Sequence, residues 1–166
     1  MSTDQSMTDT NTTPLRRTYS ERVASSESIR RGGPLNPAGW IADAIVVPGG
    51  YETIYFSGVM PTVDPGGRGA ANAAAQSHDV FAKIGVLLRS QGLTERDVVS
   101  MTVYMVTTDG TPMDFPGMMQ AYIEFYGSDE QPNRPVRTTV QVAKLGIPGA
   151  LIEVQVIAVR KPAQPA

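Results

Sequence analysis

Five short segments of the chain are rich in apolar and β-branched residues and predict β-strands, and apolar and polar residues alternate in the second, fourth and fifth of them. The segments are residues 40–47, 51–57, 98–106, 136–142 and 151–159. Pro48-Gly49-Gly50 separates the first two segments and has the composition of a turn. We therefore expect the first two strands to form a hairpin.

Helical spacing of apolar residues occurs twice between these strands. Residues 70–91 carry one apolar stripe, and Gly92 follows as a stop signal. A second stripe begins after Asp114, a favourable helix N-cap, and ends at Gly127. The stripe residues are Val80, Phe81, Ile84, Leu87 and Leu88 in the first helix, and Phe115, Met118, Met119, Tyr122, Phe125 and Tyr126 in the second.

The predicted order is β-β-α-β-α-β-β, an α+β fold with one sheet. Two helices cover only one face of such a sheet, so the other face is expected to meet solvent or another subunit. Residues 1–35 are predicted to be a flexible extension, 36–162 one domain and 163–166 a short tail, because the chain ends are polar or rich in proline.

Two charges interrupt the last two strands: Arg137 and Glu153. A lone charge in an apolar strand is costly to bury unless it is paired or used. If the valine and isoleucine faces pack against the helices, the uncovered face carries Arg137, Thr139, Gln141, Glu153 and Gln155. An interface ion pair and a functional site both remain open, and the planar arginine fork, which binds a carboxylate with two hydrogen bonds, favours the site.

Composition narrows the possible functions. The chain of 166 residues has a net charge of −2, which argues against a surface that neutralises nucleic-acid phosphates. It has no cysteine and one histidine, so neither a zinc site nor a thiolate nucleophile is expected. No apolar run approaches the roughly 20 residues that span a bilayer, and no secretory signal is visible. We therefore expect a cytoplasmic protein that binds no metal, nucleic acid or membrane.

Several motifs of the sequence belong together as one known pattern. Their residues are Arg134-Pro135-Val136-Arg137, Val140, Ala143, Leu145 and Ile152-Glu153-Val154, then Phe56-Ser57-Gly58 with Pro61, and Ala74-Ala75-Gln76 with Gly92-Leu93 at the ends of the first helix. In combination they resemble the signature of the RidA/YjgF family, small enamine/imine deaminases once labelled endoribonuclease L-PSP. The resemblance covers about residues 39–160.

The resemblance implies a chorismate-mutase-like fold in which the last strand lies between the second and the third. It also implies a homotrimer with sites between subunits, a small carboxylate substrate and no cofactor. Arg137 would hold the substrate carboxylate, and Glu153 would position or activate water. Ser57 and Gly58 would form a pocket edge.

Three further positions are expected to bind substrate by the same resemblance. Trp40 lies near the place where the family often has a cavity-lining tyrosine. Thr139 stands where many members have cysteine, and Met119 where an asparagine often lines the pocket. The residue after Arg137, Thr138, is also unusual for the signature.

The function expected from this resemblance is hydrolytic deamination of 2-aminoacrylate-type enamines and imines, which releases ammonia and a 2-keto acid. The altered pocket positions leave open a larger enamine acid such as 2-aminomuconate. A non-catalytic trimer that binds small carboxylates is a third possibility, which needs Arg137 but not Glu153. Ribonuclease activity is disfavoured by the acidic balance and the single histidine.

Overall fold

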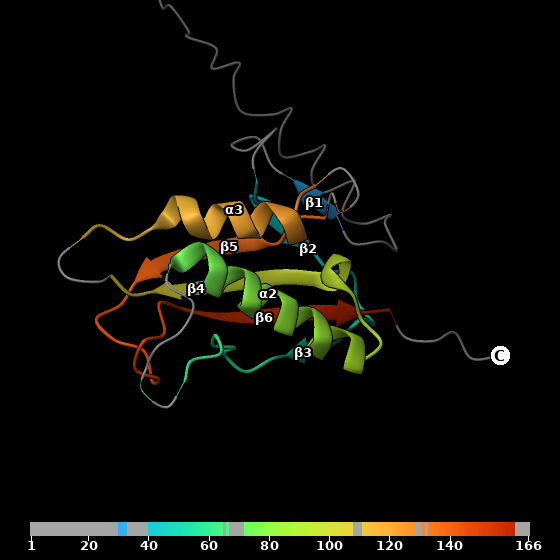
Figure 1. Ribbon diagram of the computed structural model, residues 1–166. Coiled ribbons are helices and arrows are strands. Elements are labelled where there is room, and N and C mark those ends of the chain that lie inside the picture. The colour runs from blue at the N-terminus through green and yellow to red at the C-terminus, as the bar shows by residue number, and fades with distance from the viewer. Residues whose placement is uncertain are drawn as a thin grey trace, which may run out of the picture.

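A four-stranded mixed sheet forms the centre of the molecule, and two helices lie on one of its faces (Figure 1). The computed structural model describes residues 30–32, 40–64, 66, 72–107, 111–128, 131 and 133–161. Across the sheet the order is β3 (Glu52–Tyr55), β6 (Ile152–Arg160), β4 (Val98–Met105) and β5 (Val136–Gln141). β6 is antiparallel to both neighbours, whereas β5 is parallel to β4. The last strand therefore lies between the second and third predicted strands.

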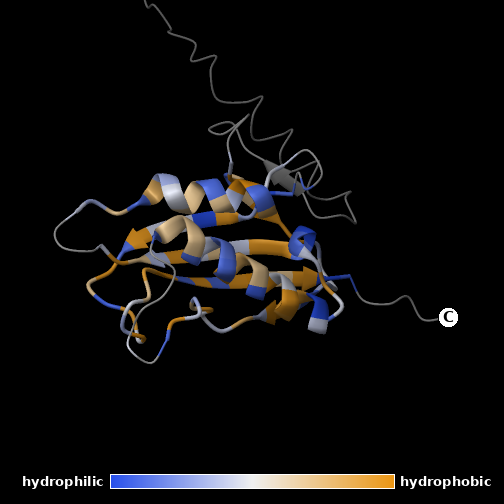
Figure 2. Ribbon diagram, in the orientation of Figure 1, coloured by the Kyte–Doolittle hydropathy of each residue, from blue (hydrophilic) through white to orange (hydrophobic). Residues whose placement is uncertain are grey.

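The helices α2 (Ala73–Ser90) and α3 (Phe115–Phe125) confirm the two helical predictions. The Asp114 side chain caps α3 by accepting a hydrogen bond from the Gly117 N–H (3.0 Å). A short 3₁₀ helix, η1 (Glu95–Asp97), leads into β4. Figure 2 shows the apolar residues concentrated along the strands beneath the helices. The fully buried core side chains include Phe81, Ile84, Leu88, Met101, Met105, Met118, Tyr122, Tyr126 and Ile152.

The expected hairpin between the first two strands is wrong. β2 (Ala44–Val46) instead pairs with β1 (Arg30–Gly32) in a separate two-stranded sheet, and β3 pairs with β6. A turn such as Pro48-Gly49-Gly50 reverses the chain, but it does not select the strand that pairs next. β6 gives β3 an apolar neighbour on the core side, where Ile54 lies opposite the buried Ala158.

A buried glutamine fixes the loop that enters β6. Gln76 in α2 is 1% exposed, and its amide donates to the Gly149 carbonyl oxygen (2.9 Å). Its side-chain oxygen accepts a hydrogen bond from the Leu151 N–H (2.7 Å). These two bonds hold the loop of residues 142–151 against α2 and so position the first residues of β6.

Most of the chain outside this core lies beyond the described residues. The residues outside the described ranges include 1–29 and 33–35 of the predicted extension and the predicted tail at 163–166. Within the part of the chain that the structure describes, no helix combines the length and apolar character needed to cross a membrane.

Candidate functional site

The register of β5 turns Arg137 toward the helices. Arg137 lies opposite Met101 of β4, and Thr139 lies opposite Val103. Strand neighbours in register share a face of the sheet, and Met101 and Val103 are buried beneath the helices. The expectation that Arg137 and Thr139 lie on the uncovered face is therefore wrong.

The physical reason for this error is that β5 is an edge strand. Its valines do not identify the core side, since Val140 is 37% exposed on the uncovered face. The same register places Gln141 opposite the buried Met105, on the helix side.

The Arg137 guanidinium lies against two aromatic rings of the α3 segment. Its Cζ atom is 4.3 Å from the centroid of the Tyr122 ring and 5.7 Å from that of Phe115, both within cation–π range. Burial lowers the pKa of Arg137, yet an arginine stays protonated at neutral pH. Phe115 and Tyr122 were expected from the sequence only as core residues, and their proximity to Arg137 was missed.

Three buried polar atoms in this region lack a hydrogen-bond partner among the described residues: Nε and Nη1 of Arg137, and the hydroxyl oxygen of Thr139. Buried donors are normally paired. The two guanidinium nitrogens therefore retain donors for hydrogen bonds to an anion.

Tyr122 connects Arg137 to the predicted site residue Trp40. The Tyr122 hydroxyl donates to the Trp40 carbonyl oxygen (2.9 Å). The Trp40 side chain is 46% exposed, and the Arg134 guanidinium lies 5.9 Å from its ring centroid. Met119, also on α3, is partly buried and packs against the core. We use the name arginine cluster for Arg137, Thr139, Phe115, Tyr122 and Trp40.

The second group of predicted residues surrounds Glu153 on the uncovered face. Glu153 lies opposite Tyr104 of β4, and its side chain passes directly over Gly58. A Cβ atom added to Gly58 would lie 2.8 Å from Glu153 Cδ and closer still to the carboxylate oxygen Oε1. We use the name glutamate cluster for Glu153, Ser57 and Gly58.

A β-bulge creates this close approach. Tyr55 pairs with Ile157 and Val59 bridges to Val154, so the segment that contains Ser57 and Gly58 has one residue more than the strand it faces. Bulges of this kind redirect side chains next to functional sites. Both Ser57 and Gly58 are exposed.

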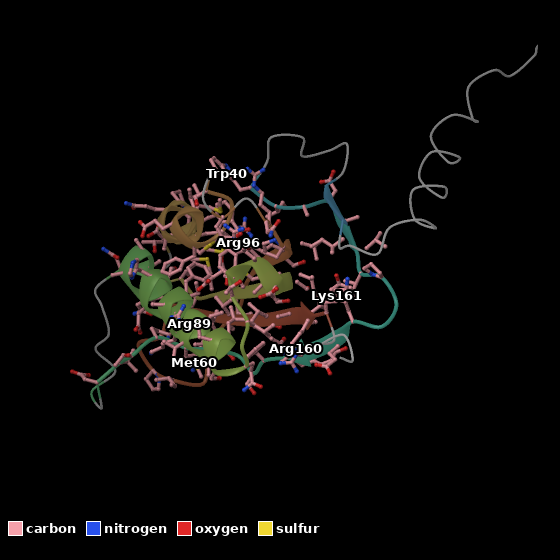
Figure 3. The ribbon with its side chains drawn as sticks, turned by 90° about the vertical axis from the view of Figure 1, so that its right-hand side faces the viewer. Trp40, Met60, Arg89, Arg96, Arg160 and Lys161 are labelled. Atoms are coloured by element: carbon pink, nitrogen blue, oxygen red, sulfur yellow. The ribbon has the colours of Figure 1, made fainter. Side chains whose placement is uncertain are left out.

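The two clusters do not meet within one chain. Arg137 and Glu153 lie on opposite faces of the sheet, on strands that are separated by β4 and are therefore roughly 9.5 Å apart. Along the strands the two residues are offset by the three positions from Met101 to Tyr104, which adds roughly 10 Å. In Figure 3, Trp40 of the arginine cluster lies on the opposite side of the molecule from Met60, which follows Gly58 of the glutamate cluster by two residues. An ion pair between Arg137 and Glu153 of the same chain is therefore not formed.

Two surface hollows reflect the same separation. One, of about 340 Å³, is lined by Glu153, Gly58, Tyr104 and Lys144, among others. Another, of about 370 Å³, is lined by residues that include Arg137, Asp43 and Thr138. No group of three or more histidine, aspartate or glutamate side chains that could hold a metal ion occurs in the described ranges.

Comparisons with known proteins agree with this architecture. The family model for endoribonuclease L-PSP matches residues 42–160. A RutC family protein of Haemophilus influenzae is 31% identical over 108 residues, which are 65% of this chain and 79% of the relative. The chain therefore belongs to the RidA/YjgF/L-PSP (RutC) family.

Solved structures of this family share the fold. The YjgF gene product of E. coli is 29% identical, with a TM-score of 0.54 over 65% of this chain and 80% of that one. E. coli TdcF, solved with bound serine, is 25% identical, with a TM-score of 0.55 over 79% and 94% of the two chains. A Rid family protein of Yersinia pestis superposes with a TM-score of 0.64 at 24% identity, over 78% and 97% of the two chains.

Tyr122 gives the stability of the protein a pH dependence that can be measured. Burial raises the pKa of Tyr122 to about 12, although the positive charges of Arg137 and Arg134 oppose the rise. The folded phenol thus keeps its proton longer than the unfolded one, whose pKa is 10.0. The stabilisation is complete below pH 10 and is lost as the pH rises to about 12, at roughly 1.4 kcal/mol per pH unit.

We expect Tyr122→Phe to lack this contribution. Its free energy of unfolding should therefore fall less steeply between pH 10 and about pH 12 than that of the wild type. Urea unfolding across this pH range measures it. Tyr55→Phe, at a tyrosine that is 74% exposed, is the matched control and should retain the wild-type slope. An unchanged slope in Tyr122→Phe would contradict the account.

Proposed function

We propose that this protein is a hydrolytic deaminase that converts 2-aminoacrylate-type enamines and imines to 2-keto acids. The observation that carries the proposal is the Arg137 guanidinium, which has two buried nitrogens, Nε and Nη1, without a partner among the described residues and lies on an aromatic platform. A planar guanidinium fits a carboxylate. Membership of the family and the serine bound to the related TdcF, a small carboxylate, support the same substrate class.

The proposed reaction uses water as its only co-reactant. The enamine first tautomerises to the imine, and water then forms a C–O bond at the imine carbon. The resulting carbinolamine loses ammonia, so that imine and water give keto acid and ammonia. Arg137 holds the carboxylate and thereby orients the imine carbon. Glu153 takes a proton from the attacking water and returns it to the departing nitrogen.

We propose further that the active site lies between two subunits of a homotrimer. The placement of Arg137 and Glu153 on opposite faces of one sheet supports a site in which each comes from a different chain. The uncovered face also carries apolar surface suited to an interface, including Tyr55, which is 74% exposed, and Val140. The half of the site that contains Arg137 would be lined by Trp40, Thr139 and Met119. The half that contains Glu153 would be lined by Ser57 and Gly58.

A non-catalytic trimer that binds small carboxylates is the second candidate. It is favoured by the fact that the arginine cluster is complete within one chain and does not involve Glu153. Binding that survives in Glu153→Gln, together with a wild-type rate no greater than the uncatalysed one, would support this function over the deaminase.

We expect Arg137→Ala to lower kcat/KM for 2-aminoacrylate about 100-fold, because a charged contact to the carboxylate is lost. Arg137→Lys keeps the charge but not the planar fork, so its kcat/KM should lie between those of the wild type and Arg137→Ala. The substrate is generated from serine by a PLP-dependent dehydratase, and keto-acid release is followed. Arg89→Ala, at an exposed arginine paired with Glu95, is the control. Wild type no faster than Arg137→Ala would end the proposal.

Gly58→Ala tests the position of Glu153 with a single methyl group. The new Cβ would occupy the space of the Glu153 carboxylate, which has to swing away. Because the end of a glutamate side chain moves easily, the free energy of unfolding should change by less than about 1 kcal/mol. Activity should fall at least about 10-fold in kcat, since proton transfer depends on position.

The control for this substitution is Gly49→Ala, where an added Cβ meets no atom within 4 Å. It should behave as wild type in both activity and stability. Full activity in Gly58→Ala would show that the observed position of Glu153 is irrelevant to catalysis.

A further inference from the structure

Lys144 places a positive charge in the same hollow as Glu153. Both residues line the 340 Å³ hollow on the uncovered side, together with Gly58 and Tyr104. Lys144 is exposed. Within the described part of the chain it forms no ion pair of 4.0 Å or less, although Glu153 lines the same hollow.

The backbone that carries Lys144 is held in place from two sides. The Val142 N–H donates to the Met105 carbonyl oxygen (2.8 Å), which continues the contact between β5 and β4. On the far side, Gln76 binds the backbone at Gly149 and Leu151. The base of the side chain is thus fixed, while its flexible four-carbon stem can adjust the position of the ammonium group.

The smallest substrate leaves Lys144 without a role. In the proposed reaction Arg137 of the neighbouring chain holds the carboxylate next to the imine, and Glu153 acts on the attacking water and the departing nitrogen. 2-Aminoacrylate has no further charged group, so an ammonium group in the same hollow as Glu153 has nothing to bind.

We propose that Lys144 binds a second carboxylate at the end of the substrate remote from the imine, so that the preferred substrates are dicarboxylic 2-imino acids. This inference rests on the proposed deaminase function and specifies its substrate class. The reaction stays balanced, since a dicarboxylic imine and water give a dicarboxylic 2-keto acid and ammonia. The second carboxylate is not altered.

A different role for Lys144 predicts a different result. If the ammonium group acts only on the charge of Glu153, its removal should affect every substrate equally, because Glu153 acts in the proton transfers common to all of them. Only binding of a distal carboxylate makes the effect depend on the substrate.

The test compares 2-iminosuccinate with 2-iminopropanoate, made by flavin-dependent oxidases from aspartate and alanine. Hydrolysis is measured by competition with semicarbazide, which traps the remaining imine. We expect Lys144→Met to lower the ratio of kcat/KM for the dicarboxylate to that for the monocarboxylate about 10-fold, mainly through KM. Lys144→Arg should restore much of this ratio, because it returns the charge.

Lys161→Met is the matched control. Lys161 is an exposed lysine just beyond the far end of β6 (Figure 3), eight residues from Glu153 and thus roughly 26 Å away along the strand. The ratio should not change in this variant. An unchanged ratio in Lys144→Met, or wild type active only on the monocarboxylate, would overturn the role of Lys144 alone. Wild type no faster than the uncatalysed reaction on both imines would instead overturn the deaminase function.

Discussion

The alternation of side chains along β5 and β6 is the constraint on which the site depends. In the observed register, Arg137 shares a face with the buried Met101, whereas Glu153 shares the opposite face with Tyr104. A shift of one residue would reverse the face of every side chain in a strand. The arrangement therefore gives each chain two separate clusters, and it makes assembly with another chain the simplest way to bring an arginine and a glutamate together.

The arginine cluster is built from the same contacts that stabilise the fold. The Tyr122 ring is fully buried between the helices and the sheet, stacks against Tyr126 at 5.4 Å, and also carries the Arg137 guanidinium. A desolvated cation–π contact of this kind contributes about 2 kcal/mol. The hydroxyl of the same tyrosine holds the backbone of Trp40. Core packing thus orients the arginine before any ligand arrives, which reduces the entropic cost of binding.

Local patterns in the sequence predicted the local structure well. The spacing of apolar residues located both helices and the central strands, and Asp114 caps α3 as expected. The position of the last strand in the middle of the sheet followed only from the family resemblance, because strand order depends on contacts between distant segments. The hairpin prediction failed for that reason, since β3 found its partner about 100 residues later in the chain.

The candidate site was predictable as a set of residues but not as a geometry. Arg137 and Glu153 stood out because they are charges in apolar strands. Their faces were misassigned because an edge strand can present valine to solvent and arginine to an aromatic helix face. The contact of Phe115 and Tyr122 with Arg137 could not be predicted, because both residues follow the same apolar spacing as the core residues of their helix.

Subunit complementation tests the central claim, a site shared by two chains, most directly. Arg137→Ala and Glu153→Gln chains are refolded together in equal amounts, mixed oligomers are verified by native mass spectrometry, and imine hydrolysis is measured. In a ring with head-to-tail interfaces, about one interface in four joins an intact arginine to an intact glutamate, so the mixture should recover about a quarter of wild-type activity. A mixture as inactive as either variant alone would contradict the account.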